Sequence, residues 1–438
     1  MSASTPIIAP DHVAKAYCIP FESPLARGLF WRFFKQQTPG VAVYILRTIV
    51  ILFLFSHSSL LFASDELLDS GRTLTIDFLL EQAISRNLIA GGVVVVGKHD
   101  TVLYSVARGR LSHAPDAPPL DERTIFDVAS LTKVLATTPA VMKLLEEGQI
   151  TLMDPLTRWF PEFSGSGRED ITILNLLTHT SGLNDIEIAG AEPLASAISE
   201  VATQKKWYPP GKRFHYADIN FILLGELVHR VSGVGLDEFC REHIYIPLNT
   251  QETMFLPPNN LSGNIAPTLS THNELSSGTV QDTNSRHLGG VAGHAGLFSS
   301  AADITRFARM ILNNGILAGQ SIFSEHIVTQ MTAPYFYSNG KVVRGLGWDI
   351  NSPFSAPKGS YFSDMSFGHT GYSGASLWID PQRDLFVVLL TTRLDYQNTK
   401  MFNRLRHDIS SLAVAAFWNK SRGEVVTENG SPPEPLMP

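Results

Sequence analysis

The chain has 438 residues, of which 44% are hydrophobic and 17% are charged, so it can bury a large core and is not expected to be disordered. Its 34 basic residues against 41 acidic residues give a net charge of -7, which provides no broad basic surface and excludes a typical nucleic-acid partner. The two cysteines, Cys18 and Cys240, are too few for a disulfide scaffold, and the sequence contains no Cys-x-x-Cys pair. The composition therefore indicates a globular protein that is held together by packing.

The first 64 residues have the pattern of an export segment. Residues 1–47 contain five basic and two acidic residues, a local charge of +3, and residues 48–64 are uncharged with a dense apolar run at 49–55. Acidic residues follow at Asp65, Glu66 and Asp69. A basic flank, an apolar stretch and an acidic exit predict a body outside the cytoplasm, either periplasmic or anchored to the outer face of the cytoplasmic membrane.

The sequence does not decide whether this segment is a membrane anchor or a cleaved signal peptide. Its 17 residues are short for a membrane anchor and include a polar break at 56–59, whereas Leu61-Phe62-Ala63 is a passable but imperfect cleavage site for a signal peptide. A third interpretation, a buried helix of the fold, is disfavoured because nothing upstream resembles a domain in which it could pack. In either export interpretation Cys18 is removed or separated from Cys240, so we expect no intrachain disulfide.

Strand patterns lie near both ends of the remaining chain and helical patterns lie between them. After an expected helix at 74–87, strands at 92–97 and 102–106 form one predicted hairpin, and strands at 375–379 and 385–392 form another. We expect the two hairpins to share a sheet. Helices are predicted at 131–147, 173–177, 193–203, 221–231, 236–243, 302–313 and 401–418.

This order of elements predicts an α+β fold. Strands from both chain ends would form an antiparallel sheet flanked by helices, with a helical domain inserted between them. The compact domain is expected to span residues 72–420, because no linker-like stretch divides it. A tail at 421–438 contains four prolines and is expected to be mobile.

Ser130 and Lys133 are the candidate catalytic pair. Ser130-Leu131-Thr132-Lys133 follows an expected short strand at 124–128 and opens the long helix. Residues three apart at a helix start share one face, which places a nucleophile beside its base. The helix dipole should also lower the pKa of Lys133 towards neutrality. The alternative is that Ser130 only caps the helix.

Two other serines, Ser338 and Ser355, also stand three residues before a lysine. An Asn-Gly pair follows the first and a proline lies within the second, so both are predicted to lie in turns where no helix sets the geometry.

Further motifs follow in an order that is typical of one family. They are the Ser130–Lys133 motif, Leu-Leu-Thr-His-Thr-Ser-Gly-Leu at 176–183, Tyr216-Ala217-Asp218 and His369-Thr370-Gly371. With the segments at 152–155 and 289–298, they resemble the serine β-lactamase and penicillin-binding protein group, in particular its class C lactamase, carboxypeptidase and esterase branch. The likeness covers nearly the whole compact region. It implies the β-lactamase/transpeptidase-like fold, with the active site between the sheet and the inserted helical domain.

The resemblance also implies the roles of these residues. Ser130 would attack an acyl carbonyl and form an acyl-enzyme, Lys133 would take or relay its proton, and Tyr216 would be the second proton-transfer group. The oxyanion would be bound by the backbone N–H groups of Ser130 and Tyr372. The alternative for Tyr216 is a tyrosine packed beneath a loop.

Two departures from the family pattern bear on the substrate. His369 stands where lactamases of this branch usually have a lysine, and with a usual pKa of about 6.5 it would attract a substrate carboxylate only at lower pH. Asp218 stands where an asparagine usually donates its amide to the substrate, and a carboxylate only accepts. Both changes weigh against an efficient β-lactamase, whereas they leave acyl transfer itself intact.

We expect neither a cofactor nor a catalytic metal. The glycine-rich segment 289–296 lacks the preceding strand and later acid of a dinucleotide site and is interpreted as structural, with His294 as a loop histidine. His287 and His294 have no carboxylate at metal-ligand spacing, and His179 is expected to cap a helix end. The sequence has no Gly-x-Ser-x-Gly elbow, which argues against an α/β-hydrolase.

The sequence therefore predicts an exported serine hydrolase, with a D-alanyl-D-alanine carboxypeptidase-like enzyme preferred. Its expected partners are a small-molecule or peptide substrate, such as a peptidoglycan stem peptide, and a membrane through the N-terminal segment. Two alternatives remain: a carboxylesterase on the same site, and a non-hydrolytic module that binds wall peptides. The retention of Ser130, Lys133 and Tyr216 counts against the binding module.

Overall fold

The computed structural model describes residues 71–204, 208–269 and 275–418. The predicted export segment and the predicted tail at 421–438 lie outside the described residues. Within the described ranges, no single helix is long and apolar enough to cross a membrane, and one helix pair bent by 77°, Ile219–Ser232 with Leu236–Leu248, meets the length and composition only in combination.

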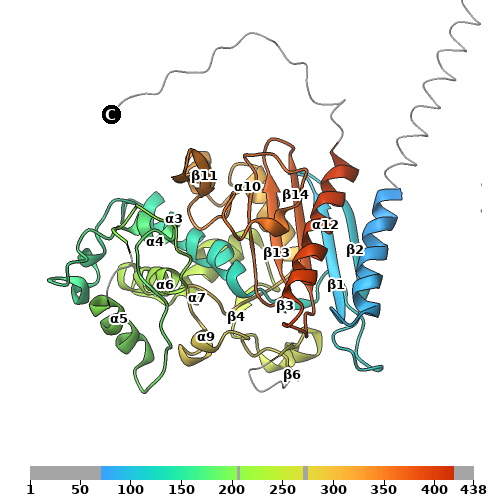
Figure 1. Cartoon of the computed structure of the whole chain (residues 1–438), viewed down its shortest axis with the longest axis horizontal. Coiled ribbons are helices and arrows are strands. Elements are labelled where there is room, and N and C mark those ends of the chain that lie inside the picture. The colour runs from blue at the N-terminus through green and yellow to red at the C-terminus, as the bar shows by residue number, and fades with distance from the viewer. Residues whose placement is uncertain (1–70, 205–207, 270–274, 419–438) are drawn as a thin grey trace, which may run out of the picture. The chain divides into compact units, whose positions relative to one another are not determined.

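A five-stranded antiparallel sheet joins the two ends of the domain (Figure 1). Its strands lie in the order β12 (Phe367–Thr370), β13 (Ser376–Asp380), β14 (Leu385–Thr391), β1 (Gly91–Gly97) and β2 (Val102–Gly109). β1 pairs with β14 in a register that sets Val94 opposite Leu389. The pairing confirms that the two predicted hairpins share one sheet.

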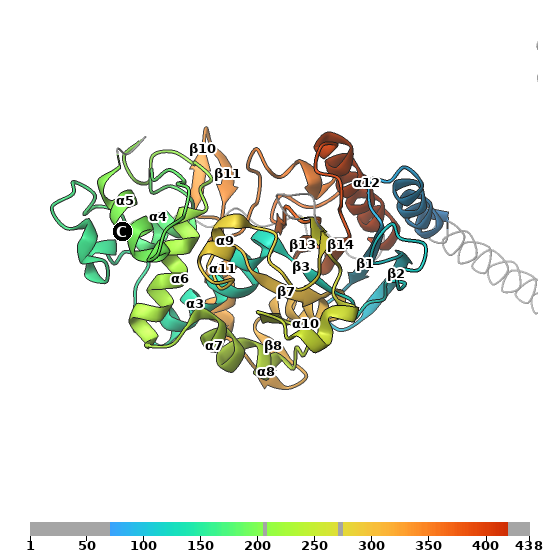
Figure 2. The same ribbon diagram turned by 90° about the horizontal axis from the view of Figure 1, so that it is seen from below.

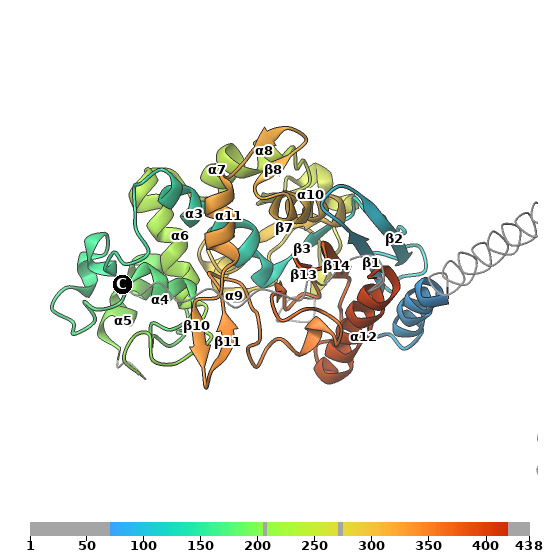
Figure 3. The same cartoon turned by 90° about the horizontal axis from the view of Figure 1, so that it is seen from above.

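Helices cover both faces of this sheet. Successive side chains of a strand point to opposite faces. On one face Val94 and Val96 pack beneath the helical residues 71–85 and α12 (Thr399–Phe417), which lie side by side in Figures 1 and 3. On the other face Val93 and Val95 join the main core, which also contains residues of α10 (Ala301–Leu312). Burial on both faces explains the unbroken run of valines in β1.

The inserted domain is mostly helical and shares the main core with the sheet (Figure 2). Its helices are α3 (Thr138–Glu146), α4 (Ile173–Leu177), α5 (Pro193–Thr203), α6 (Ile219–Ser232), α7 (Leu236–Cys240), α8 (Ile246–Leu248), α9 (Thr283–His287) and α11 (Glu325–Thr332). The bounds of α4 and α5 are those predicted. The α+β architecture with a helical insertion is therefore confirmed.

Short strands connect the two parts. β3 (Ile125–Asp127), β7 (Leu297–Ser300) and β4 (Met254–Phe255) form a three-stranded sheet in the order β3-β7-β4. Two-stranded ribbons are formed by β5 (Thr268–Leu269) with β6 (Leu275–Ser276), β8 (Ile316–Leu317) with β9 (Gln320–Ser321), and β10 (Phe336–Ser338) with β11 (Lys341–Arg344). The pairing of β3 with β7 brings the residues that follow β3 next to those that precede β7.

The region predicted as one long helix at 131–147 is divided into three helical segments in the structure. A 3-10 turn at Ala129–Leu131 is followed by a π-helical stretch, Lys133–Thr137, and only then by α3. Hydrogen bonds anchor this region to the segment that leads into β7. The Thr137 hydroxyl donates to Gly293 O at 2.6 Å, and Thr132 Oγ1 accepts from the Leu297 N–H at 3.1 Å. Apolar spacing alone does not reveal such tertiary anchoring.

Candidate active site

Ser130 lies in the sharp turn between β3 and the helical run. Ala129 before it has a φ of 46°, an uncommon value for a residue with a side chain. The carboxylate of Asp127 holds this turn by accepting from the Ala129 N–H at 2.8 Å, and burial raises the pKa of Asp127 to about 6. The predicted position of Ser130 at the start of a helical run is confirmed, and the serine is partly exposed.

Lys133 is fully buried and its ammonium has three close oxygen partners. Its Nζ donates to Ser130 Oγ at 3.1 Å and to His294 O at 3.0 Å. The same Nζ lies 2.7 Å from Asp218 Oδ1. A carboxylate only accepts, so the contact with Asp218 at ion-pair distance matches the protonated form of Lys133.

Tyr216 lies over the same cluster. Its hydroxyl is within hydrogen-bond reach of both Lys133 and Ser130, and Lys133 Nζ lies 5.1 Å from the centre of its ring. The ring of His179 stacks on Tyr216 with 4.4 Å between centroids. His179 has a φ of 54° directly after α4, and its Nδ1 accepts from the Ala217 N–H at 3.3 Å, so it holds Tyr216 in place besides ending the helix.

The Asp218 carboxylate overturns one electrostatic expectation. Burial acts to lower the pKa of Lys133, but Asp218, with a smaller contribution from Tyr216, outweighs it, and this pKa lies above its ordinary value. Conversely, burial acts to raise the pKa of Asp218, and Lys133 holds it below its usual range. The helix dipole was expected to bring Lys133 towards neutrality, and a direct ion pair is the stronger effect. Burial also raises the pKa of Tyr216, so its phenol is neutral.

The end of β12 packs directly on the nucleophile turn. A Cβ added to Gly371 would lie 2.3 Å from Val128 O, which shows how closely the backbones approach. The neighbouring Thr370 is partly buried. The side chain of Tyr372 is 53% exposed and stacks on Tyr396. The oxyanion site formed by its backbone N–H stays a prediction.

His369 lies beside Tyr216 but cannot respond to pH as expected. Its ring centroid is 6.1 Å from that of Tyr216, its Nδ1–H donates to Thr370 O at 2.9 Å, and the residue is only 4% exposed. Burial lowers the pKa of His369 well below its usual value, and the positive charges of Arg344 and Lys133 add to this effect. The expectation that His369 gains charge near pH 6.5 is therefore wrong, because the imidazole is buried among cations.

Arg344, at the end of β11, was not identified from the sequence. It is fully buried, its guanidinium lies 5.5 Å from the ring of Phe214 and 6.0 Å from that of Tyr216, and its Nη2 donates to Gly347 O at 2.8 Å. A lone arginine in a strand carries no sequence signal for such a position, which depends on the approach of distant segments.

The glycine-rich segment 289–296, interpreted as structural, forms one wall of the site. It supplies the His294 carbonyl to Lys133, and a Cβ on Gly293 would lie 1.9 Å from Phe221 O of α6. The His294 ring, 1% exposed, donates from Nε2 to Asp282 Oδ1 at 2.8 Å, and Asp282 caps α9 through the Ser285 N–H. Burial acts to raise the pKa of Asp282, but His294 outweighs it and lowers this pKa to about 2.

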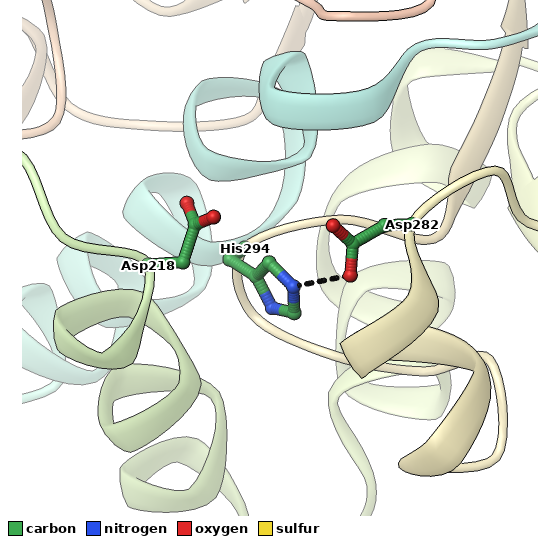
Figure 4. A group of neighbouring side chains, drawn as sticks. All are labelled: Asp218, Asp282 and His294. Atoms are coloured by element: carbon green, nitrogen blue, oxygen red, sulfur yellow. Dashed lines mark hydrogen bonds and ion pairs between the residues drawn. The ribbon is translucent and has the colours of Figure 1, made fainter. Parts of the chain in front are cut away.

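Figure 4 shows His294 between the carboxylates of Asp218 and Asp282. Their ligand atoms lie within 4.8 Å of one another, so the three side chains have the chemistry of a cation site. The ammonium of Lys133 already contacts Asp218 Oδ1, and a metal ion bound there would be repelled by it. We therefore interpret the group as part of the ion-pair network around Lys133.

The predicted residues thus separate into two groups. Ser130, Lys133, Tyr216 and Asp218 form one cluster, with His369 in contact with Tyr216. The other serines with a lysine three residues on lie elsewhere: Ser338 ends β10, and Ser355 precedes a 3-10 turn at Ala356–Lys358. Asp218 was expected to face the substrate, and the structure places it on Lys133.

Comparison with known proteins gives one family. A family model described as Beta-lactamase matches residues 76–409. A relative from Escherichia coli strain K12, provisionally named D-alanyl-D-alanine carboxypeptidase, is 30% identical over 305 residues, which cover 62% of this chain and 69% of the relative.

Solved structures share the fold. EstCE1, a hydrolase with promiscuous acyltransferase activity, has a TM-score of 0.63 at 22% identity and covers 79% of this chain and 100% of its own. A class C beta-lactamase has a TM-score of 0.64 at 20% identity and covers 78% of this chain and 96% of its own. At these identities the structures bear on the fold alone.

Proposed function

The chain belongs to the beta-lactamase family of serine hydrolases, and we propose that it is an exported D-alanyl-D-alanine carboxypeptidase-like enzyme that acts through an acyl-enzyme on Ser130. The main support for the proposal is the geometry of the cluster. Lys133 Nζ lies 3.1 Å from Ser130 Oγ, and the Tyr216 hydroxyl is within hydrogen-bond reach of both residues. The name of the 30% identical relative supports the substrate class.

The proposed reaction uses these groups in two half-reactions. In the first, Ser130 Oγ attacks the acyl carbonyl, its proton passes to the amine form of Lys133 or along Tyr216, and the leaving amine of the terminal D-alanine takes that proton. In the second, a water molecule attacks the ester carbonyl and gives a proton to the same pair. The bond between the acyl carbon and Ser130 Oγ breaks, and the pair returns the proton to Ser130 Oγ. Backbone N–H groups of Ser130 and Tyr372 would stabilise the oxyanion in both steps.

A carboxylesterase is the second candidate, favoured by the state of His369. A buried, neutral imidazole supplies no charge for the terminal carboxylate of a D-alanyl-D-alanine peptide. An ester substrate without a carboxylate would lose nothing from this.

One comparison separates these candidates. The full chain and its Ser130→Ala variant would be given a D-alanyl-D-alanine peptide, a p-nitrophenyl ester and a fluorescent penicillin under the same conditions. The proposal expects Ser130-dependent release of D-alanine with the highest kcat/KM. Faster turnover of the ester with no release of D-alanine would favour the esterase. Binding of wall peptide without turnover of any donor would favour the binding module.

A further inference from the structure

We propose that Asp218 restrains the nucleophile. Its ion pair keeps Lys133 in the ammonium form in most protein molecules, and Ser130 reacts with an acyl donor only in the minority in which Lys133 is an amine. This inference rests on the proposed acylation of Ser130. It gives Asp218 a role that its position in the sequence motif did not suggest, as a positioning residue that acts through Lys133.

Three oxygens lie around the buried Nζ of Lys133. Ser130 Oγ, His294 O and Asp218 Oδ1 all lie within 3.1 Å of Lys133 Nζ, and the side chain is fully buried. Ser130 Oγ could also donate its proton to an amine, so its contact does not fix the charge of Lys133. The carboxylate oxygen of Asp218 only accepts, and it lies at ion-pair distance from Nζ, which favours the ammonium. The resting arrangement is therefore that of an ammonium, which donates to Ser130 and cannot accept its proton.

Other ionisable groups also surround Lys133. They are Asp185, Asp218, Asp282, His179, His294, His369 and Tyr216, and Arg344 lies 6.0 Å from the Tyr216 ring. Of the three carboxylates, only Asp218 forms an ion pair with Lys133 within the described residues. Removal of its charge should therefore lower the pKa of Lys133 more than any other single neutralisation.

Asp218 can be replaced without loss of a helix-capping hydrogen bond. It occupies the N-cap of α6, but its side chain makes no capping hydrogen bond, and the Ile219 N–H donates instead to Asp185 Oδ1 at 2.9 Å. Asparagine has the same shape and keeps an oxygen that can accept from Lys133. Asp218→Asn thus changes charge while leaving the fold and the contact geometry intact.

Asp218→Asn should change the acylation rate in opposite directions at lower and at higher pH. An opposite charge at this distance typically shifts a pKa by about one to three units. In Asp218→Asn the acid limb of the pH profile for acylation should therefore move down by about one to three pH units, which raises the rate near pH 7. The alkaline plateau should fall, because a base with a lower pKa is a weaker base. The two profiles should cross.

The test measures the acylation of Ser130 by p-nitrophenyl acetate, from the burst of p-nitrophenol, across pH 5.5 to 10.5 in the full chain. Asp282→Asn is the matched control, because it removes an equal charge that contacts His294 rather than Lys133. It should move the limb much less. Asp127, beneath the nucleophile turn, is the same in both variants, so its titration cancels in the comparison.

A second readout is independent of any substrate. The Lys133 ammonium would be followed by nitrogen NMR across the same pH range, with the signal assigned by its loss in Lys133→Ala. Because the pKa of Lys133 lies above its ordinary value in the wild type, its ammonium signal should persist to pH 10.5 there, whereas in Asp218→Asn the signal should titrate at lower pH, which supports the inference. A signal that persists equally in both proteins, or an acid limb that does not move, overturns it. If no donor acylates Ser130, the proposed function fails while the NMR titration still decides the role of Asp218.

Discussion

The side chain of His369 illustrates how burial changes a residue's chemistry. From sequence alone this histidine is a proton switch near pH 6.5, whereas in the fold it is 4% exposed, donates to Thr370 O, and lies near two cations. Lys133 changes in the opposite direction because it gains a carboxylate partner. In both cases the sequence indicated that the residue lies near the site but not its protonation state, because that state depends on segments that are distant in the chain.

The neutral state of His369 has a consequence for stability. Its folded pKa lies below the unfolded value of about 6.5, so below that pH the unfolded chain binds a proton that the folded chain does not. The free energy of unfolding should therefore fall as the pH drops below 6.5. At pH 5.5 His369 should contribute a loss of about 1.4 kcal/mol relative to pH 7.5. Urea unfolding of His369→Gln should show a correspondingly smaller drop.

The exposed His326 provides the control for this prediction. His326→Gln replaces a surface histidine in the same way without changing the buried ring of His369, so it should keep the wild-type dependence on pH. A drop in His369→Gln equal to that of the wild type would mean that the folded chain protonates His369 as easily as the unfolded chain does.

At the level of elements, local patterns located most of the fold. The valine run of β1, the helices α4 and α5, and the hairpin that ends in β14 were predicted within a few residues, because each has a strong pattern and its own turn chemistry. The 3-10 and π-helical turns around Ser130 were not predicted. They depend on bonds to the chain near β7, more than 150 residues away, such as that between Thr137 and Gly293.

The candidate site was predictable to the same extent. Ser130, Lys133 and Tyr216 belong to short motifs with a local geometry or a family resemblance. The contribution of segment 289–296 is a backbone carbonyl, which has no identity in the sequence, and Arg344 belongs to no motif. The partner of Lys133 was named, as Asp218, but its contact depends on how α6 meets the nucleophile turn.

The contact between segment 289–296 and α6 can be tested by substituting Gly293. In Gly293→Ala the new Cβ would clash with Phe221 O at 1.9 Å and meet Gly225 N at 2.9 Å, so the segment must move away from α6. Overpacking of this kind typically costs about 1–3 kcal/mol in stability. Withdrawal of the His294 carbonyl from Lys133 should also slow Ser130 acylation by up to about 10²-fold.

Gly263→Ala is the matched control, because no atom lies within 4 Å of the added Cβ and the backbone there has no left-handed φ. Chemical denaturation and the acylation burst measure the two effects. If Gly293→Ala unfolds and reacts like Gly263→Ala, the segment does not position Lys133.

For the molecule as a whole, the charge pattern separates the N-terminal segment from the domain. Residues 1–47 carry +3 in a chain with a net charge of -7, and they precede an uncharged apolar segment. We predict that a phosphatase reporter that is active only after export will be active when it is fused to the C-terminus. Deletion of residues 48–64 should abolish that activity. Full-length protein recovered from the cytoplasm in soluble form would contradict the prediction.

Ser130 is the proposed nucleophile of this beta-lactamase-family hydrolase. The full chain would be labelled with a fluorophosphonate, which reacts with activated serines, and the adduct located by mass spectrometry of its peptides. We expect one adduct on Ser130, absent in Ser130→Ala and retained in Ser338→Ala and Ser355→Ala, the other serines that stand three residues before a lysine. An adduct on another residue, or undiminished labelling of Ser130→Ala, would contradict it.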